Sequence, residues 1–181
     1  MCGQVIQLDN SLSKAISKVK WAYFLIYVHL KIANIDLLAD WWAYIIILGV
    51  IPVIAEYEPS AMLLKPMATL LVFTEIAGQV AEFTGIGFPY TINVIICIMY
   101  TYLHFQLITN IHTAVTDRGC SGGWLLWLRN ITVVSHTVYF LFLNLSSNTL
   151  MVWLFGIADL IGCISLIFSL SGQAAEVKQT E

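Results

Sequence analysis

Charged residues are scarce in this sequence. Only 10% of its 181 residues are charged and 59% are hydrophobic, with a mean hydropathy of +0.83, whereas an ordinary soluble domain is about 25% charged. Because a soluble domain of this length buries only roughly 70% of the surface that its unfolded chain exposes, much apolar surface would stay in contact with water. The composition therefore excludes an ordinary soluble fold and predicts an all-α integral membrane protein that contacts the lipid bilayer.

The sequence also lacks the patterns of several common functional classes. Its net charge is −3 and its few basic residues are scattered, which excludes an electrostatic surface for nucleic acid. The four cysteines show no CxxC or Cys/His ligand spacing, and the histidines no HExxH pairing, so we expect neither a disulfide framework nor a metal site. Phosphate-binding loops, nucleotide fingerprints and Gly-x-Ser-x-Gly elbows are absent as well. We therefore expect no cofactor, and any energy source would be an ion gradient or a partner.

What the sequence does contain is long apolar segments. The hydrocarbon core of a bilayer is about 30 Å thick, so a spanning helix needs roughly 20 mostly apolar residues. Candidate segments cover residues 19–38, 41–55, 67–83, 88–111, 124–145 and 150–170. We therefore expect a single membrane domain, a bundle of about six transmembrane helices, between a polar N-terminus at 1–14 and a C-terminal tail at 171–181. Because 1–14 has no signal-peptide pattern, we expect the mature chain to start near Met1.

The first two segments fit this pattern least well. The segment 19–38 contains the polar side chains His29, Lys31 and Asp36. The segment 41–55 is short for a span. Either segment can therefore be interfacial or re-entrant, and a bundle of five spans is the alternative to six.

The basic residues indicate the orientation of the chain, since cytoplasmic loops carry an excess of lysine and arginine. Six spans with a cytoplasmic N-terminus place most basic residues on the cytoplasmic side: Lys14, Lys18, Lys20, Lys65, Arg118 and Lys178. Only Lys31 then lies outside, apart from Arg129 within a span. Five spans would separate the N-terminal lysines from Lys65 and Arg118. We therefore expect a multi-pass protein of the cell membrane with both termini in the cytoplasm.

Polar residues inside the predicted spans are candidate ligand-binding residues: Glu75, Gln79, Glu82, Arg129, His136 and Asp159. Ionisable groups in a membrane are costly, so they face the bundle interior and often mark the path of a solute or proton. Glu75, Gln79 and Glu82 recur at i, i+4 and i+7 and therefore share one helical face. One interpretation joins Glu75, Glu82, Asp159 and Arg129 in a polar centre. The other makes Arg129 the partner of one carboxylate in a structural ion pair.

His112 and Cys120 lie near each other in the sequence, with Asp117 between them. A histidine and a cysteine that meet at the cytoplasmic face form the nucleophilic pair of an intramembrane cysteine protease. The glycine-rich approach to the histidine and the spacing of such enzymes are not present here. A protease-like enzyme is therefore the third interpretation, with no catalytic residue assigned.

The stretch 32–54, IANIDLLADWWAYIIILGVIPVI, resembles a group of small polytopic membrane proteins of Gram-positive bacteria. In that group an Asn-Ile-Asp-like turn precedes a Leu-Pro-Asp-Trp-Ile-Gly-Tyr-like entry into the next helix. Leu38, Asp40, Trp41 and Tyr44 match this entry, and alanines stand where the group has proline and glycine. The group has no assigned activity, so the resemblance implies a bacterial membrane setting and no particular chemistry.

Two further function classes stand beside the enzyme. We expect a non-enzymatic protein that binds or transports an unknown small solute, because an inward polar stripe in a compact helical bundle provides a solute site. The alternative is a structural or accessory subunit of a larger complex, whose polar face contacts a partner membrane protein or a second copy of the chain. In that case Glu75 and Glu82 act in assembly rather than in turnover.

Overall fold

Six α-helices make up most of the chain. The computed structural model describes residues 2–27, 31–32, 35–36, 40–85, 89–145 and 149–180. Its elements are α1 (Cys2–Tyr27), β1 (Lys31–Ile32), β2 (Ile35–Asp36), α2 (Asp40–Ala55), the 3-10 helix η1 (Pro59–Leu63), α3 (Leu64–Thr84), α4 (Tyr90–Thr116), α5 (Leu125–Leu145) and α6 (Thr149–Gln179). The strands β1 and β2 form a two-residue antiparallel ladder.

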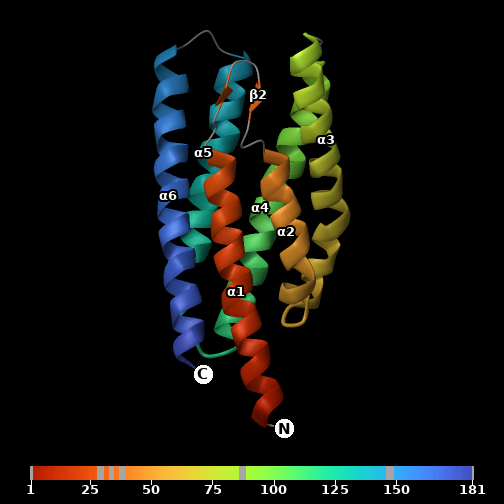
Figure 1. Cartoon of the computed structure of the whole chain (residues 1–181). Helices are drawn as coiled ribbons and strands as arrows, with labels where there is room; N and C mark the ends of the chain where they lie inside the picture. The colour runs from red at the N-terminus through yellow and green to blue at the C-terminus, as the bar shows by residue number, and fades with distance from the viewer. Residues whose placement is uncertain are drawn as a thin grey trace.

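The helices form an antiparallel bundle in which each helix packs against the next in sequence, and α6 packs against α1 (Figure 1). The bundle is therefore a closed ring. Both chain ends lie at one end of it, which we call the termini end. The strands β1 and β2 lie at the opposite end, which we call the hairpin end.

Among the described residues, four helical segments are long and apolar enough to cross a membrane: Pro59–Thr84, which joins η1 to α3, then α4, Leu125–Leu143 of α5, and α6. The helix α2 is apolar but has only 16 residues, about 24 Å of helix. Large apolar side chains cover the outside of the bundle, and Phe83 and Phe168 are 71% and 73% exposed. Such a surface suits contact with lipid. The predicted helical membrane class is thus supported, and four of the helices qualify as spans.

The first helix lies earlier in the sequence than expected. It includes residues 2–14, which the sequence pattern assigns to a polar tail, and it ends at Tyr27 inside the predicted segment 19–38. One face of α1 is buried, while Lys14 and Lys18 are exposed. The apolar residues of α1 lie on one face and the charged residues on the other. Its average hydropathy is therefore low, and a search for apolar runs does not detect this helix.

The rest of the predicted first segment is not one continuous helix, since β1 and β2 lie within it. Its residues 28–30, 33–34 and 37–39 lie outside the described part of the chain. At the other end of the sequence, α6 continues to Gln179 and includes most of the predicted tail 171–181. Its buried residues Gln173, Ala174 and Val177 explain this extension, because they pack inside the bundle.

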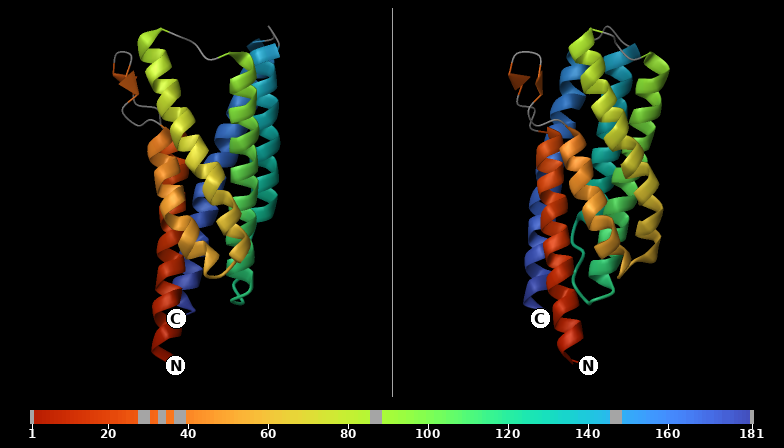
Figure 2. Two further views of the ribbon diagram at one scale, coloured as in Figure 1. Left: turned by 90° about the vertical axis from the view of Figure 1, so that its right-hand side faces the viewer. Right: turned by 45° about the vertical axis from the view of Figure 1, so that its right-hand side comes forward.

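At the hairpin end, α1 and α2 stop short of the other helices (Figure 2). Tyr27, the last residue of α1, donates a hydrogen bond to Asp159, which lies about 15 Å of helix after the start of α6 at Thr149. At the start of α2, Trp41 donates to Gln79, about 7 Å before the end of α3. The upper parts of α3 to α6 therefore enclose space that α1 and α2 do not fill.

The termini end, in contrast, is held by polar contacts between distant segments. The Ser13 hydroxyl donates to the Ala174 carbonyl at 2.7 Å and so joins α1 to α6. The backbone and hydroxyl of Ser121 donate to the Glu176 carboxylate, which fixes the α4–α5 loop against α6. These contacts make the termini end the closed end of the bundle.

The helices α5 and α6 approach closely at Gly162. A Cβ built on Gly162 lies 3.0 Å from Thr132 Oγ1 and 3.7 Å from both Thr132 Cα and Ile131 Cγ2. Small residues at a helix contact let backbones approach, which is how membrane helices gain packing energy without a hydrophobic driving force.

We predict that Gly162→Val lowers the free energy of unfolding by about 1–3 kcal/mol, because the added methyl groups overpack this contact. Gly172→Val is the matched control on the same helix, since a Cβ there meets nothing within 4 Å. The control should change stability by less than about 0.5 kcal/mol. Denaturation in detergent measures both variants, and equal effects would contradict the close contact.

Candidate functional site

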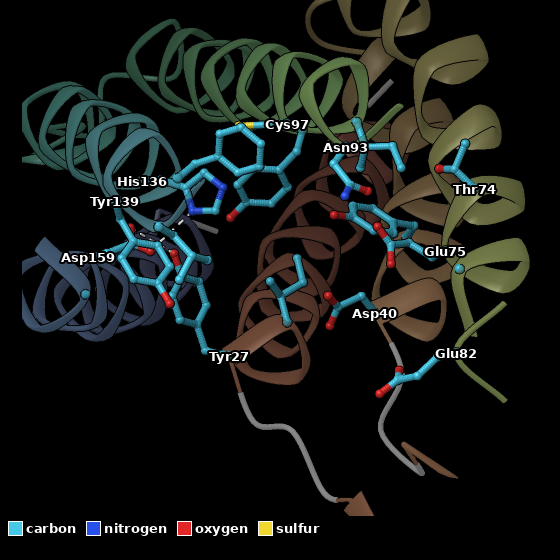
Figure 3. A pocket seen from close by; sticks show the side chains of 18 of the residues that line it. Tyr27, Asp40, Thr74, Glu75, Glu82, Asn93, Cys97, His136, Tyr139 and Asp159 are labelled. Atoms are coloured by element: carbon cyan, nitrogen blue, oxygen red, sulfur yellow. Dashed lines mark hydrogen bonds and ion pairs between the residues drawn. The ribbon is translucent and has the colours of Figure 1, made fainter. Parts of the chain in front are cut away.

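A cavity of about 850 Å³ lies inside the hairpin-end half of the bundle, and all the helices contribute to its wall. Its polar lining residues are Tyr27, Asp40, Tyr44, Thr74, Glu75, Glu82, Asn93, Tyr100, His136, Tyr139 and Asp159. Figure 3 shows Tyr27, His136, Tyr139 and Asp159 on one side, and Asp40, Glu75 and Glu82 on the other. The volume is in the range of pockets that hold small molecules, roughly 300–1,000 Å³.

The cavity occupies the space that the two short helices leave open. The end of α1 contributes Ile26 and Tyr27, and the start of α2 contributes Asp40 and Tyr44. Since α3 to α6 extend further towards the hairpin end, their inner faces line the remainder. Because α1 ends at Tyr27 and α2 starts at Asp40, these polar residues lie at the cavity wall. If the two helices continued further towards the hairpin end, their side chains would fill this space.

Asp159 is the most enclosed acid of the cavity, at 5% exposure. The Tyr27 hydroxyl donates to its Oδ1 at 3.2 Å, and His136 Nδ1 lies 3.3 Å from its Oδ2. These contacts join α1, α5 and α6 around one carboxylate. An ionised carboxylate accepts about four hydrogen bonds, so the two contacts leave acceptor capacity for a bound molecule.

Aromatic rings form much of the remaining wall. The rings of Tyr100 and His136 lie 4.5 Å apart between centroids. Tyr139 packs over Gly156, where a Cβ would lie 3.2 Å from the ring carbon Cε2. Because glycine has no Cβ, the Tyr139 ring can approach the α6 backbone closely at this position.

Two polar groups on α4 are buried without a hydrogen-bond partner among the described residues. The Tyr100 hydroxyl is one, on a cavity-lining residue that is 8% exposed. His104 is the other, with both ring nitrogens unpaired in that part of the chain. Its ring lies 5.0 Å from that of Tyr23 and 6.1 Å from that of Tyr100. Buried polar groups of this kind call for an explanation such as a bound molecule.

The structure brings four of the six candidate residues to the cavity wall: Glu75, Glu82, His136 and Asp159. Gln79 is not among the described lining residues, and its Oε1 accepts a hydrogen bond from Trp41 Nε1 at 3.0 Å. The helical periodicity of α3 thus indicated the right face for Glu75 and Glu82, while Gln79 contacts the start of α2.

Arg129 does not belong to this polar centre. It lies near the start of α5, towards the termini end, where its Nη1 donates to Thr109 Oγ1 at 2.6 Å. Its guanidinium carbon lies 3.8 Å from the centroid of the Phe105 ring, and it also donates to Asn130. No carboxylate of the described residues forms an ion pair with it. Arg129 was predicted either to join a polar centre or to form an ion pair with a carboxylate. In the structure it instead contacts residues along the outside of α4 and α5.

Sequence reasoning missed the tyrosines and Asp40. Tyr27 and Tyr100 carry no charge and occur in apolar runs, so nothing distinguishes them from packing residues. Asp40 stood out only as part of the resembling helix entry in the stretch 32–54, yet it lines the cavity. Tyr27, Tyr100 and Asp40 come together because α1 ends at Tyr27. The sequence pattern does not reveal where α1 ends.

The pair that suggested a protease lies at the termini end. Cys120 is 5% exposed, whereas reactive cysteines occupy partly exposed sites. His112 packs against Gly122, where a Cβ would lie 2.7 Å from His112 Nε2 and φ is +62°. These contacts favour a packing role for both residues. Within the described ranges, no group of three or more histidine, cysteine or acidic side chains is placed to hold a metal ion.

We predict that Tyr27→Phe lowers the free energy of unfolding by about 0.5–1.5 kcal/mol, because it removes a donor to a buried carboxylate. Tyr102→Phe is the control, since that tyrosine is 44% exposed on the outside of α4. In an Asp159→Leu background the Tyr27→Phe effect should disappear. Additive effects in this double-mutant cycle would show that the contact does not stabilise the fold.

Comparisons with known proteins add no assignment to this geometry. No family model, no curated protein and no solved structure matches the chain. The function is therefore argued from the cavity and its lining residues.

Proposed function

We propose that this protein is a polytopic membrane protein that binds and transports a small solute through the cavity between its helices. The observation that carries the proposal is the convergence of acidic, imidazole and tyrosine side chains from all six α-helices on one cavity of about 850 Å³. Large pockets with a few convergent polar groups are where small ligands bind. Ionisable residues in the middle of a helical membrane bundle commonly mark solute pathways.

The lengths of the helices support a particular placement in the bilayer. The apolar part of α6 covers 149–170 and has Asp159 near its middle. Tyr27 is bonded to Asp159 and therefore lies at the same depth. From Tyr27 back to Lys18 is about 14 Å of helix, which brings Lys18 and Trp21 close to the interface at the termini end. We therefore place α3 to α6 across the bilayer. The helix α1 then reaches about halfway from the termini end, and α2 reaches to about 7 Å from the hairpin-side end of α3.

This placement implies an orientation. The basic residues in or next to the loops of the termini end, Lys65 and Arg118, favour the cytoplasm for that end. Both chain ends then lie on the cytoplasmic side of the cell membrane, and the cavity faces the opposite side. A bacterial setting follows only from the resemblance of the stretch 32–54.

The accessory-subunit interpretation receives less support. It requires the polar face of α3 to meet a partner helix outside the bundle. Glu75, which is half-buried, and Glu82, which is exposed, instead both line the cavity. The polar face of α3 is therefore directed at the cavity, where a solute would bind.

A matched pair of tryptophan substitutions tests solute binding. Ala81 lines the cavity, whereas its neighbour Val80 is 57% exposed on the same helix. We expect a thermal-shift screen of small cations, anions and neutral solutes on the detergent-purified protein to yield stabilising compounds. Ala81→Trp should abolish their effect by filling the cavity, and Val80→Trp should preserve it. Failure to find any compound that distinguishes the two variants would overturn the proposal.

The native Cys97 tests the orientation, because it lines the cavity. In a variant that retains only this cysteine, we expect a membrane-impermeant trimethylammonium methanethiosulfonate reagent to label it from outside intact cells. Ala81→Trp should slow the labelling, and Cys97→Ser is the blank. Labelling only in inverted vesicles would reverse the orientation. Labelling from neither side would show that the cavity is closed to water.

A further inference from the structure

We propose that the outer face of α4 and α5 binds one anionic phospholipid from the leaflet at the termini end. The lipid phosphate binds Arg129, and an acyl chain lies in an apolar groove that begins beside this residue. The proposal does not depend on the transport of a solute through the cavity. It rests on the charge of Arg129, on its depth in the membrane and on the shape of the groove.

Arg129 carries a positive charge on the outside of the bundle. Its side chain is half-buried, and its hydrogen bonds go to the neutral oxygens of Thr109 and Asn130. In the part of the chain that the structure describes, no acidic side chain pairs with it. Because a charge at membrane depth is costly without a counter-charge, this site favours an anion. A phosphate suits it, since its oxygens match the planar fork of guanidinium N–H donors.

The position of Arg129 along α5 corresponds to the headgroup level of a bilayer. Trp124 and Trp127 are 69% and 55% exposed at the start of this helix, and exposed tryptophans concentrate at the membrane interface. Arg129 follows Trp127 by two residues, about 3 Å of helix. A long basic side chain near a helix end extends to the interface. The guanidinium is therefore within reach of lipid phosphates.

A groove of about 350 Å³ lies between α4 and α5, which pack side by side (Figure 2). Phe105 connects it to Arg129, because the Phe105 ring lines the groove and its centroid lies 3.8 Å from the guanidinium carbon. On α5 the groove is lined by Val133 and Thr137, which follow Arg129 at i+4 and i+8 and share its face. On α4 it extends from Phe105 to Cys97, about 12 Å along the helix.

The dimensions of the groove fit an acyl chain rather than a protein helix. A volume of about 350 Å³ over about 12 Å of length gives a cross-section of about 30 Å². A helix with a diameter of about 10 Å has a cross-section of about 80 Å². The lining is almost wholly apolar, and the Thr137 hydroxyl donates to the Val133 carbonyl of its own helix. An anionic phospholipid thus supplies both parts, a phosphate for the guanidinium and a chain for the groove.

Lipids that share their chains and differ in headgroup charge test the role of Arg129. Native mass spectrometry of the full-length protein in detergent measures the Kd of the complex with one lipid. Dioleoylphosphatidylglycerol should bind about fivefold more tightly than dioleoylphosphatidylcholine, because the headgroup of the former has a net negative charge. Arg129→Gln should remove this preference, and Arg129→Lys should retain part of it. Lys65→Gln, which removes an exposed basic residue at the same end, is the charge-matched control and should keep the preference.

A pair of neighbouring substitutions tests the groove and keeps the test decisive if Arg129→Gln does not fold. Val133→Trp retains the arginine and fills the groove. It should weaken binding of both lipids about fivefold, because the acyl chain then loses buried apolar surface. Val134→Trp is the matched control, since Val134 is 60% exposed and is not one of the described residues that line the groove.

A third probe separates a lipid from a free phosphate. Glycerol 3-phosphate, which has no acyl chain, should not bind at millimolar concentration, and binding as tight as that of the lipid would overturn the assignment. Equal Kd values for the two lipids, or a preference that persists in Arg129→Gln, would also overturn it. A dimer that dissociates only in Val133→Trp would show that a second copy of the chain, and not a lipid, covers the groove.

Discussion

The contact between Asp159, Tyr27 and His136 is the interaction on which the architecture depends. A carboxylate in the interior of a lipid-facing bundle needs donors, and here they come from the end of α1 and from α5. Because Tyr27 is the last residue of α1, this contact fixes how far α1 extends alongside α6. Everything above it, including the volume of the cavity, depends on α1 ending at this level.

The two ends of the bundle therefore differ in packing. Towards the termini end the core is densely apolar, with fully buried side chains such as Ile16, Ile51 and Leu170. The Ser13, Ser121 and Glu176 contacts add cross-links between the segments there. The termini end is therefore suited to hold the helices in place while the hairpin-end half binds a solute. A rigid base with a polar hollow above it is how a protein positions binding groups precisely.

The sequence predicts some of these features well, for physical reasons. The helices α2 to α5 lie within a few residues of continuous apolar runs, because a helix surrounded by lipid and by other helices must be apolar on every side. The helix α1 could not be located in this way. Its apolar stripe, with Leu12, Ile16 and Tyr23 buried, alternates with lysines, so only its pattern and not its average hydropathy is informative.

The candidate site divides in the same way. Glu75 and Glu82 were identifiable because ionisable residues in a membrane segment gather on the face that lines a cavity, and their spacing puts them on one face of α3. The position of Arg129 could not be derived from that rule, since a long side chain near a helix end can extend along the surface to Thr109 and Phe105 instead. Tyr27 and Tyr100 could be recognised as site residues only from the structure, which shows how far α1 extends along the bundle. The chemical role of a tyrosine depends on what lies next to its hydroxyl, and the sequence does not show this.

The short reach of α1 and α2 also concerns the surrounding lipid. In the proposed placement, α1 stops near the bilayer centre and α2 stops about 7 Å before the hairpin-side end of α3. Acyl chains of one leaflet therefore meet a shorter apolar helix surface at that part of the ring. Such hydrophobic mismatch costs a fraction of a kcal/mol per Å and is relieved by local thinning of the bilayer. The membrane next to this pair of helices should accordingly be thinner than elsewhere around the protein, which shortens the barrier between the aqueous phase and Asp159.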